Sequence, residues 1–388
     1  MSTELVAEYL DRIAAISPAI SGRTAEAEEL RRVPTENIKE LGEAGLFRVF
    51  QPQRFGGPEL SMADVLPMIT QTAMACPSSS WVMAVLQIHQ WILGLSPEQT
   101  QDEVWGDDPE ALLCGVLQPR AMAKRVEGGY ELGAAVWPYA SGCDFASWAH
   151  VGGLVQNDNG PPDATVFLLP AKDFEIIDDW HVVGLRGTGS KSLSMKGTFV
   201  PAHRGFKLAD AIAGKLGEGR STLYQSAILP MLCLNITGTA LGVARTTIET
   251  FITHIEKRNL PFSMDKQVDS PQTHELLAEV MLMVDSAELL LDKGGALVRD
   301  YAEAREQMPV IERSQVRVYS SAAVRQCVTA IDVMFAASGG SALQENNPLY
   351  KLSMNARAVA AHAALAHENN LQLWGAARLG KPLNSPMI

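Results

Sequence analysis

The spacing of apolar residues changes twice along the chain and divides it into three segments. In the first segment, apolar residues in Ala25–Leu46 recur at helical spacing among glutamates and arginines. Met62–Ala75 and Ser79–Leu95 have the composition of buried helices, and Ser78–Ser80 is suited to cap the second of them at its N-terminus. The pattern predicts a helical domain over residues 1–112.

The middle segment has a period typical of strands. A Gly-Gly pair within Ala123–Glu131 separates two strand-like pieces, as in a hairpin. Further short stretches are β-branched or alternating and are bounded by Gly, Pro, Asn and Asp, at 151–155, 165–169 and 191–200. Since no helical pattern lies between them, we expect an antiparallel barrel or sandwich over residues 113–220.

Helical spacing returns in the third segment, residues 221–388. Four long amphipathic helices are predicted at about 224–257, 272–306, 310–337 and 348–376. The breaks between them fall at Pro261, Pro309 and Gly339-Gly340, so the connections are short and a four-helix bundle is expected. The predicted fold class is therefore α+β and mainly helical, in the order helical domain, β domain, helical bundle.

Composition narrows the classes of function. The 388 residues include 44 acidic and 32 basic side chains, a net charge of −12, and no block of Lys and Arg, which argues against a nucleic-acid-binding surface. The N-terminal stretch is acidic, unlike a secretory signal, and the most apolar run, Trp81–Leu95, is too short to span a membrane. The five scattered cysteines are typical of reduced thiols. We expect a cytoplasmic protein without membrane or nucleic-acid partners.

Metal and nucleotide motifs are missing from the sequence. His362 and His367 are five residues apart, which on a helix places them on different faces, so no metal site is expected. No GxGxxG or GxxxxGK[ST] motif is present. The Gly-rich run Gly184–Ser190 lies between strand-like pieces instead of between a strand and a helix, so it fits neither the Rossmann nor the P-loop pattern.

Two loops have the composition of a ligand site. Trp137–Trp148 and Gly184–Ser190 combine small residues and hydroxyls, and the first adds aromatic rings. Such loops can approach a planar heterocycle closely, stack on it and form hydrogen bonds with it. Ordinary β-turns rich in Gly and Ser have the same composition, so the loops alone leave both interpretations open.

At these residues the chain resembles the acyl-CoA dehydrogenase superfamily, and within it the oxygenase components of two-component flavin-dependent monooxygenases of the p-hydroxyphenylacetate hydroxylase type. The resemblance is carried, in order, by Arg54–Gly57, Ser79–Trp81, Trp137–Trp148, Trp180–Ser190, Phe199–Pro201, Ser338–Gly340 and the predicted helix from Asn347 through His362 to Gly375. The helix–β–helix order deduced from the period of the pattern agrees with the fold of that family.

The resemblance implies an activity. Reduced FMN or FADH2, supplied as a diffusible co-substrate by a separate NAD(P)H:flavin reductase, would react with O2 to a C4a-hydroperoxide. This species would hydroxylate a phenolic or related aromatic substrate, ortho to its hydroxyl, in a chamber that excludes water. Members of the family are usually homotetramers. The resemblance leaves FMN against FAD and the identity of the aromatic substrate undecided.

The same resemblance assigns roles to particular residues. Ser141 would stand beside N5 of the flavin, and His89 and His362 would hydrogen-bond the phenol or take its proton. The remaining expected cofactor contacts are Ser79, Trp81, Trp137, Tyr139, Arg186, Thr188, Ser190, Gly339 and Gly340. The other six histidines, His150 among them, are expected to be surface or structural residues.

Other interpretations stay open at this point. An acyl-CoA dehydrogenase needs a carboxylate base, and no Glu lies between Glu345 and Glu368, where many members carry it; the base could lie elsewhere. N- or S-oxygenation within the monooxygenase branch, or a flavin-free scaffold, would use the same fold. Asn355 and Lys351 replace the Asp and Arg that are usual in the branch, which puts the nearby flavin or subunit contacts in doubt.

Overall fold

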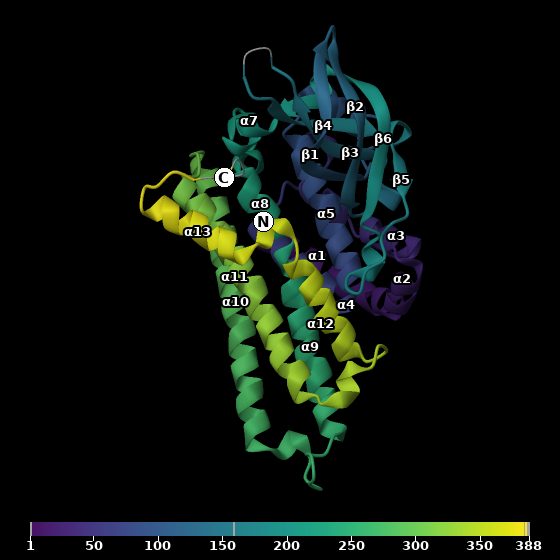
Figure 1. The fold of residues 1–388 in the computed structure, drawn as a ribbon, viewed down its shortest axis with the longest axis vertical. Helices are drawn as coiled ribbons and strands as arrows, with labels where there is room; N and C mark the ends of the chain where they lie inside the picture. The colour runs from purple at the N-terminus through teal and green to yellow at the C-terminus, as the bar shows by residue number, and fades with distance from the viewer. Residues whose placement is uncertain (1, 158–159, 384, 386–388) are drawn as a thin grey trace.

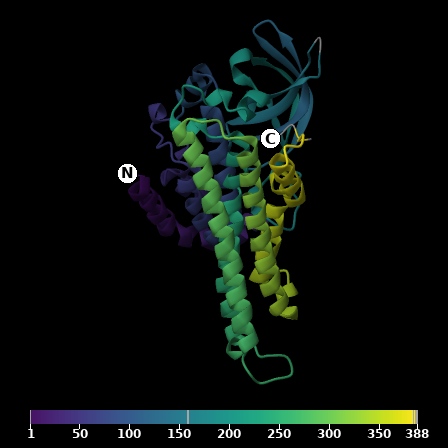
Figure 2. The ribbon, with the colours of Figure 1, turned by 90° about the vertical axis from the view of Figure 1, so that its left-hand side faces the viewer.

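The computed structural model describes residues 2–157, 160–383 and 385, and it has the predicted order of helices, sheet and helices (Figure 1). Residues 1, 384 and 386–388, at the ends of the predicted outer domains, lie outside the described part. The sheet lies at one end of the molecule, and long helices extend away from it (Figures 1 and 2). One continuous cluster of buried side chains includes residues from all three segments, so they share a core.

The first segment is helical. Its helices are α1 (Ser2–Gly22), α2 (Thr24–Leu30), α3 (Thr35–Glu43), α4 (Met62–Ala75), α5 (Pro77–Gly94) and α6 (Glu98–Trp105). The predicted cap of α5 is wrong: Pro77 occupies the first turn, so Ser78–Ser80 lie inside the helix. The hydroxyls of Ser79 and Ser80 bond to neighbouring elements instead, as when Ser80 Oγ donates to the carbonyl of Ile69 at 2.8 Å.

The middle segment forms a sheet. Its strands are β1 (Leu113–Val126), β2 (Gly129–Ala140), β3 (Trp148–Val155), β4 (Asp163–Pro170), β5 (Glu175–Ile177), β6 (Lys191–Pro201) and β7 (Gly205–Lys207). In the described part of the chain their order is β5-β6-β2-β1-β3-β4-β7. The β1–β2 hairpin is confirmed, with Val126 opposite Gly129 and Gly128 at φ 80° in the turn.

The expectation that the strands are all antiparallel is wrong for one pair. β1 and β3 run parallel, from Leu113 opposite Trp148 to Ala123 opposite Val155. The reason lies in the connection. β2 runs back along one side of β1, between β1 and β6, and the turn after β2 then crosses to the other side of β1. β3 therefore starts at the same end of the sheet as β1 and runs in the same direction. That crossing segment, residues 141–147, is the middle of Trp137–Trp148, one of the two loops singled out from the sequence.

The third segment is a helical bundle in which two predicted helices are broken. After α7 (Leu208–Ile212), its helices are α8 (Ile228–Asn235), α9 (Thr237–Lys257), α10 (Pro271–Ala304), α11 (Val310–Ala337), α12 (Pro348–Ala360) and α13 (His367–Arg378). The first predicted helix is interrupted at Ile236, and the last is interrupted between Ala360 and His367. The second interruption places His362 in a loop and not on a helix.

One stretch of the bundle is apolar enough to cross a membrane by length and composition alone. It covers Ile228–Lys257, and 89% of its most apolar window is buried inside the protein. Its apolar side chains pack against α4, α5 and α11, which makes this stretch a core element of the bundle.

Candidate active site

The centre of the site is a contact between α5 and the turn that follows β2. Trp81 Nε1 donates a hydrogen bond to Ser141 Oγ at 2.9 Å, and both side chains are buried. Gly142 allows this approach, because its φ is +76° and an added Cβ would lie 2.8 Å from Leu86 on α5. The turn can therefore sit directly against the helix only with glycine at this position.

A chain of hydroxyl groups continues from Ser141 into the second Gly-rich loop. Ser141 Oγ lies 2.6 Å from Ser190 Oγ, Ser190 Oγ lies 2.7 Å from Thr188 Oγ1, and Thr188 Oγ1 donates to the carbonyl of Leu185 at 2.9 Å. All three hydroxyl side chains are buried. The structure thus brings the two loops together, as expected, and unites Ser141, Ser190 and Thr188 with Trp81.

His362 reaches the same cluster from the bundle. Its ring lies 5.8 Å from that of Trp81 in an edge-on arrangement, and its Nδ1 accepts from the backbone N–H of Ala364 at 3.3 Å. Solvent reaches the side chain, yet desolvation by the surrounding protein lowers the pKa of His362 below its usual value. Desolvation disfavours the charged imidazolium, so the neutral form of the ring is favoured beside Trp81.

His89 lies deeper along α5 and has a different partner. It is eight residues, about 12 Å, further along the helix than Trp81. His89 Nδ1 lies 3.2 Å from His150 Nδ1, and the two rings stack with centroids 5.3 Å apart. Desolvation lowers the pKa of His89 to about 4, partly offset by a hydrogen bond with the backbone of Gly115. The described contacts join His89 to His150 and not to Ser141 or His362.

His150, which we expected to be a surface or structural residue, is buried. It lies in β3 opposite Gly115 of β1, is fully buried, and its Nε2 has no hydrogen-bond partner in the described structure. Desolvation lowers the pKa of His150 well below its usual value. A signal was available in the sequence, because Ala149 and Val151 flank it and indicate a strand covered on both faces.

Two of the predicted cofactor contacts lie in the core. Trp137 has no exposed surface, and its Nε1 donates to the carbonyl of Gly152 at 2.8 Å. Ser79 is also fully buried and accepts a hydrogen bond from Asn37 Nδ2 at 3.0 Å. These side chains fix the sheet and α5, and their polar atoms are bonded within the protein, so their contact with a cofactor stays a prediction.

Tyr139 and Arg186 lie outside the hydroxyl chain. Tyr139 is 72% exposed, has φ +69° and packs edge-on against Trp180 at 6.2 Å. Arg186 is exposed, and its Nε donates to the backbone carbonyl of Glu28 at 2.8 Å. The described side-chain contacts of both residues thus lead away from Ser141, Ser190 and Thr188, and their contact with a flavin stays a prediction.

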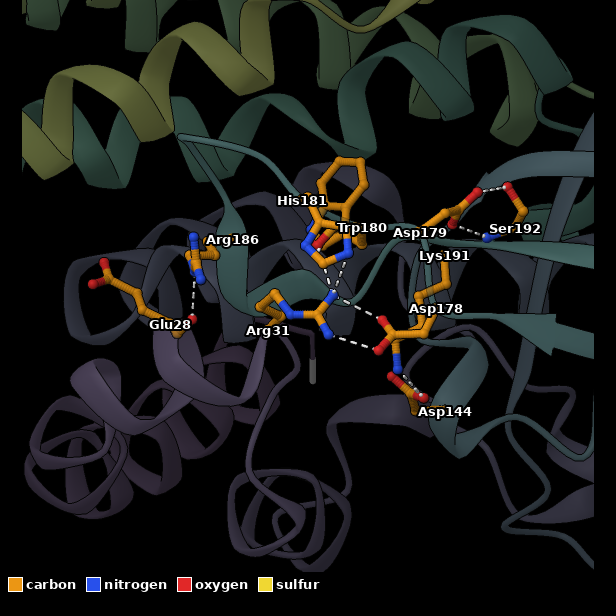
Figure 3. A network of polar contacts seen from close by, with 10 residues as sticks. All are labelled: Glu28, Arg31, Asp144, Asp178, Asp179, Trp180, His181, Arg186, Lys191 and Ser192. Atoms are coloured by element: carbon orange, nitrogen blue, oxygen red, sulfur yellow. Dashed lines mark hydrogen bonds and ion pairs between the residues drawn. The ribbon is translucent and has the colours of Figure 1, made fainter.

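The segment from Asp178 to Ser192 is held in place by a network of charged residues (Figure 3). The guanidinium of Arg31, the residue directly after α2, donates to both carboxylate oxygens of Asp178, at 2.8 and 2.6 Å. This contact holds the pKa of Asp178 below its usual value. Lys191 Nζ also lies 2.7 Å from Asp144 Oδ1, so the segment is tied to the turn that carries Ser141.

The two residues that depart from the family pattern tie α12 to its neighbours, Asn355 to the same segment and Lys351 to α2. Asn355 Oδ1 accepts from the backbone N–H of Leu185 at 2.7 Å, and Leu185 has a φ of +50°. Lys351 Nζ lies 2.6 Å from Glu28 Oε2. Both replacements therefore have protein partners, and Asn355 acts directly on the loop that contains Thr188.

Gly339 and Gly340 lie far from the hydroxyl chain. They precede α12, whose 13 residues separate them from the His362 loop by about 20 Å. An added Cβ at Gly339 would lie 2.4 Å from the guanidinium of Arg258. A groove of about 670 Å³ opens here, lined by residues of α9 and the start of α12. Within one chain, these glycines and Ser141 do not form one site.

The described residues contain no group of three or more His, Cys, Asp or Glu side chains that could hold a metal ion. All five cysteines are buried and free. The polar groups brought together here are hydroxyls, an indole and an imidazole, which suit hydrogen bonding to a heterocyclic ligand.

Comparisons with known proteins agree with this arrangement. Residues 11–105 match the N-terminal domain of acyl-CoA dehydrogenases, and residues 234–367 match a C-terminal domain of the same family. The chain is 33% identical over 385 residues to the flavin-dependent monooxygenase oxygenase subunit HsaA of Rhodococcus jostii, covering 98% of this chain and 100% of that protein.

Two further proteins are similar over nearly the whole chain. The p-hydroxyphenylacetate 3-hydroxylase oxygenase component of Acinetobacter baumannii is 31% identical, covering 98% of this chain and 90% of that protein. The structure of XiaF from Streptomyces, solved with FADH2 and glycerol, superposes with a TM-score of 0.95 at 27% identity, covering 100% of this chain and 98% of that one. The chain belongs to the flavin-dependent monooxygenase oxygenase components of the acyl-CoA dehydrogenase family.

Proposed function

We propose that this protein is an oxygenase component that uses reduced FMN or FADH2 and O2 to hydroxylate a phenolic or related aromatic substrate. The observation that carries the proposal is the cluster of Trp81, Ser141, Ser190 and Thr188 with His362 packed edge-on against Trp81. When bound, the reduced flavin activates O2 and supplies one oxygen atom to the substrate. The residues fit such a group, because the buried hydroxyl of Ser141 and the exposed imidazole of His362 both lie against the indole of Trp81.

In this proposal Ser141 forms a hydrogen bond with N5 of the flavin, and His362 accepts the proton of the phenolic hydroxyl. A phenol has a pKa near 10, whereas the pKa of His89 is about 4. Full proton transfer to His89 would then cost about 8 kcal/mol, since each pK unit corresponds to 1.36 kcal/mol. His89 is therefore better suited to hydrogen-bond the substrate, and His362, which is exposed to solvent, is the better base.

The proposal includes partners and an assembly. A separate NAD(P)H:flavin reductase supplies the reduced flavin, and the protein acts in the cytoplasm as a homotetramer. Gly339 and Gly340 lie far from Ser141 in their own chain. They can serve the flavin of another copy, with Arg258 in the adjoining groove as the phosphate contact. Tyr139 and Arg186 contact the part of the flavin that lies away from Ser141.

The experiment is a substrate panel. The purified protein is supplied with NADH, a generic flavin reductase and either FMN or FAD, together with phenols, an amino sugar, a thiophene and an acyl-CoA. We expect a phenol to gain the mass of one oxygen atom. H2O2 as the sole product with every substrate would contradict the proposal. Oxygenation of the amino sugar would indicate an N-oxygenase, and oxygenation of the thiophene would indicate an S-oxygenase. Oxidation of the acyl-CoA would indicate a dehydrogenase.

A further inference from the structure

The hydroxyl chain that ends at Ser141 has a direction, and its two ends determine it. At one end the indole N–H of Trp81 can only donate, and it donates to Ser141 Oγ at 2.9 Å. At the other end the carbonyl of Leu185 can only accept, and it accepts from Thr188 Oγ1 at 2.9 Å. Each hydroxyl between these ends has a single proton to donate.

Counting those protons assigns every bond. Thr188 gives its proton to Leu185, so in the 2.7 Å contact with Ser190 the proton comes from Ser190. Ser190 has then used its proton, so in the 2.6 Å contact with Ser141 the proton comes from Ser141. Ser141 Oγ accepts from Trp81 and donates to Ser190. What it has left for a ligand is a lone pair and no proton.

The reverse direction makes one hydrogen bond fewer. If Thr188 donated to Ser190 and Ser190 to Ser141, the proton of Ser141 would point out of the chain without an acceptor in the described structure. Leu185 would still accept from the backbone N–H of Thr188 and from Trp180 Nε1. The loss is thus one hydroxyl bond in a buried setting, where an unpaired polar group is unfavourable.

This direction distinguishes the two redox states of a flavin. Reduced flavin carries a hydrogen on N5 and donates it, whereas N5 of oxidised flavin is a bare acceptor that needs a donor. A Ser141 that presents only a lone pair matches the first and leaves the second without a bond unless the chain reverses. The match depends on Ser190 and Thr188, which need not touch the flavin themselves.

We propose that Thr188 and Ser190 are positioning residues that hold Ser141 as a hydrogen-bond acceptor, so that the site binds reduced flavin in preference to oxidised flavin. This inference rests on the proposed function, because it places N5 at Ser141. It gives a physical reason for a flavin used as a diffusible co-substrate: the site favours the form that arrives and disfavours the form that must leave.

The test is Thr188→Val, which keeps the shape of the side chain and removes the hydroxyl. Ser190 would then have only Ser141 as an acceptor, so the chain would reverse and the proton of Ser141 would point to the ligand. Dissociation constants for reduced and oxidised FMN, and for both forms of FAD, are measured by anaerobic titration. We expect the wild type to favour the reduced form and Thr188→Val to reduce that preference about tenfold, the effect of one hydrogen bond.

Two further variants make the result specific. Thr188→Ser keeps the hydroxyl and should keep the wild-type ratio of the two dissociation constants. Ser190→Ala also frees the proton of Ser141 without introducing a larger side chain, so it should lower the ratio even if Thr188→Val does not fold. Loss of affinity that is equal for both redox states, in either variant, would overturn the inference and leave the proposed function standing. Failure of the wild type to bind reduced flavin would overturn the proposed function itself.

Discussion

The two histidines that the sequence assigns to the substrate differ in their exposure to solvent. His362 is exposed beside Trp81, whereas His89 is buried and paired with His150. The residue types could be selected from the sequence, but their environments could not, because His150 comes from a strand 61 residues away. The same holds for Trp137: its aromatic character suggested a ligand contact, and only the fold shows its indole bonded to Gly152.

His362→Ala should uncouple the reaction. Without the imidazole the phenol keeps its proton, so oxygen transfer slows while the flavin is still oxidised. The yield of hydroxylated product per reduced flavin should fall at least about tenfold, with H2O2 making up the difference. Both products are measured in single-turnover reactions. His367→Ala is the matched control, because His367 bonds Ser321 on α11. A His362→Ala enzyme with wild-type product yield would remove His362 from the site.

The buried His89 should make the protein sensitive to acid. Its pKa is about 4 when folded and near 6.5 when unfolded, so the unfolded state takes up the proton first as pH falls. The stabilisation is complete above pH 6.5 and is lost between pH 6.5 and 4, by up to about 3 kcal/mol. Urea denaturation should show a shallower loss in His89→Gln than in the wild type. His274→Gln, at an exposed position, is the control. Identical pH slopes in wild type and His89→Gln would contradict the burial argument.

At the level of helices and strands, local patterns predicted the elements better than their interruptions and pairings. The alanine-rich run around His362 is a strong helix former, yet α12 ends at Ala360. The chain turns there because His362 caps a short turn at Ala364 and packs on Trp81. Similarly, β1 and β3 were evident as strands, but their parallel pairing depends on where the 141–147 crossing leads.

The ion pair between Arg31 and Asp178 should control the mobility of the loop that carries Thr188. It joins α2 to the start of that segment through two hydrogen bonds. In Arg31→Ala, backbone amides of residues 180–189 should exchange with deuterium several-fold faster, because the segment opens more often. Arg54→Ala removes a comparable pair with Asp102 elsewhere on the surface and is the control. Unchanged exchange in Arg31→Ala would show that packing alone holds the loop.

For the molecule as a whole, the order of helices, sheet and bundle followed from the period of the sequence, because period depends on local burial. Assembly does not leave such a pattern in one chain. The structure adds an indication: Leu282 and Leu289 of α10 are 66% and 69% exposed, and their spacing of seven puts them on one face. An exposed apolar face of this kind is expected to be covered by another copy in the proposed tetramer.

Charging that face should break the assembly. Sedimentation should give a tetramer for the wild type and smaller species for Leu282→Arg/Leu289→Arg, because burying two guanidinium groups without partners is unfavourable. Leu379→Arg, at an exposed leucine after α13, should leave the tetramer intact. A monomeric wild type would contradict the proposed assembly, and with it any contribution of Gly339 and Gly340 to the flavin of another copy.

A crystal structure of the protein grown anaerobically with reduced flavin would decide whether the cofactor lies where these arguments place it. The expected result is a flavin ring beside Trp81, with N5 about 3 Å from Ser141 Oγ and His362 close to the same ring. A ring bound elsewhere, with Ser141 and His362 untouched, would contradict the proposed site.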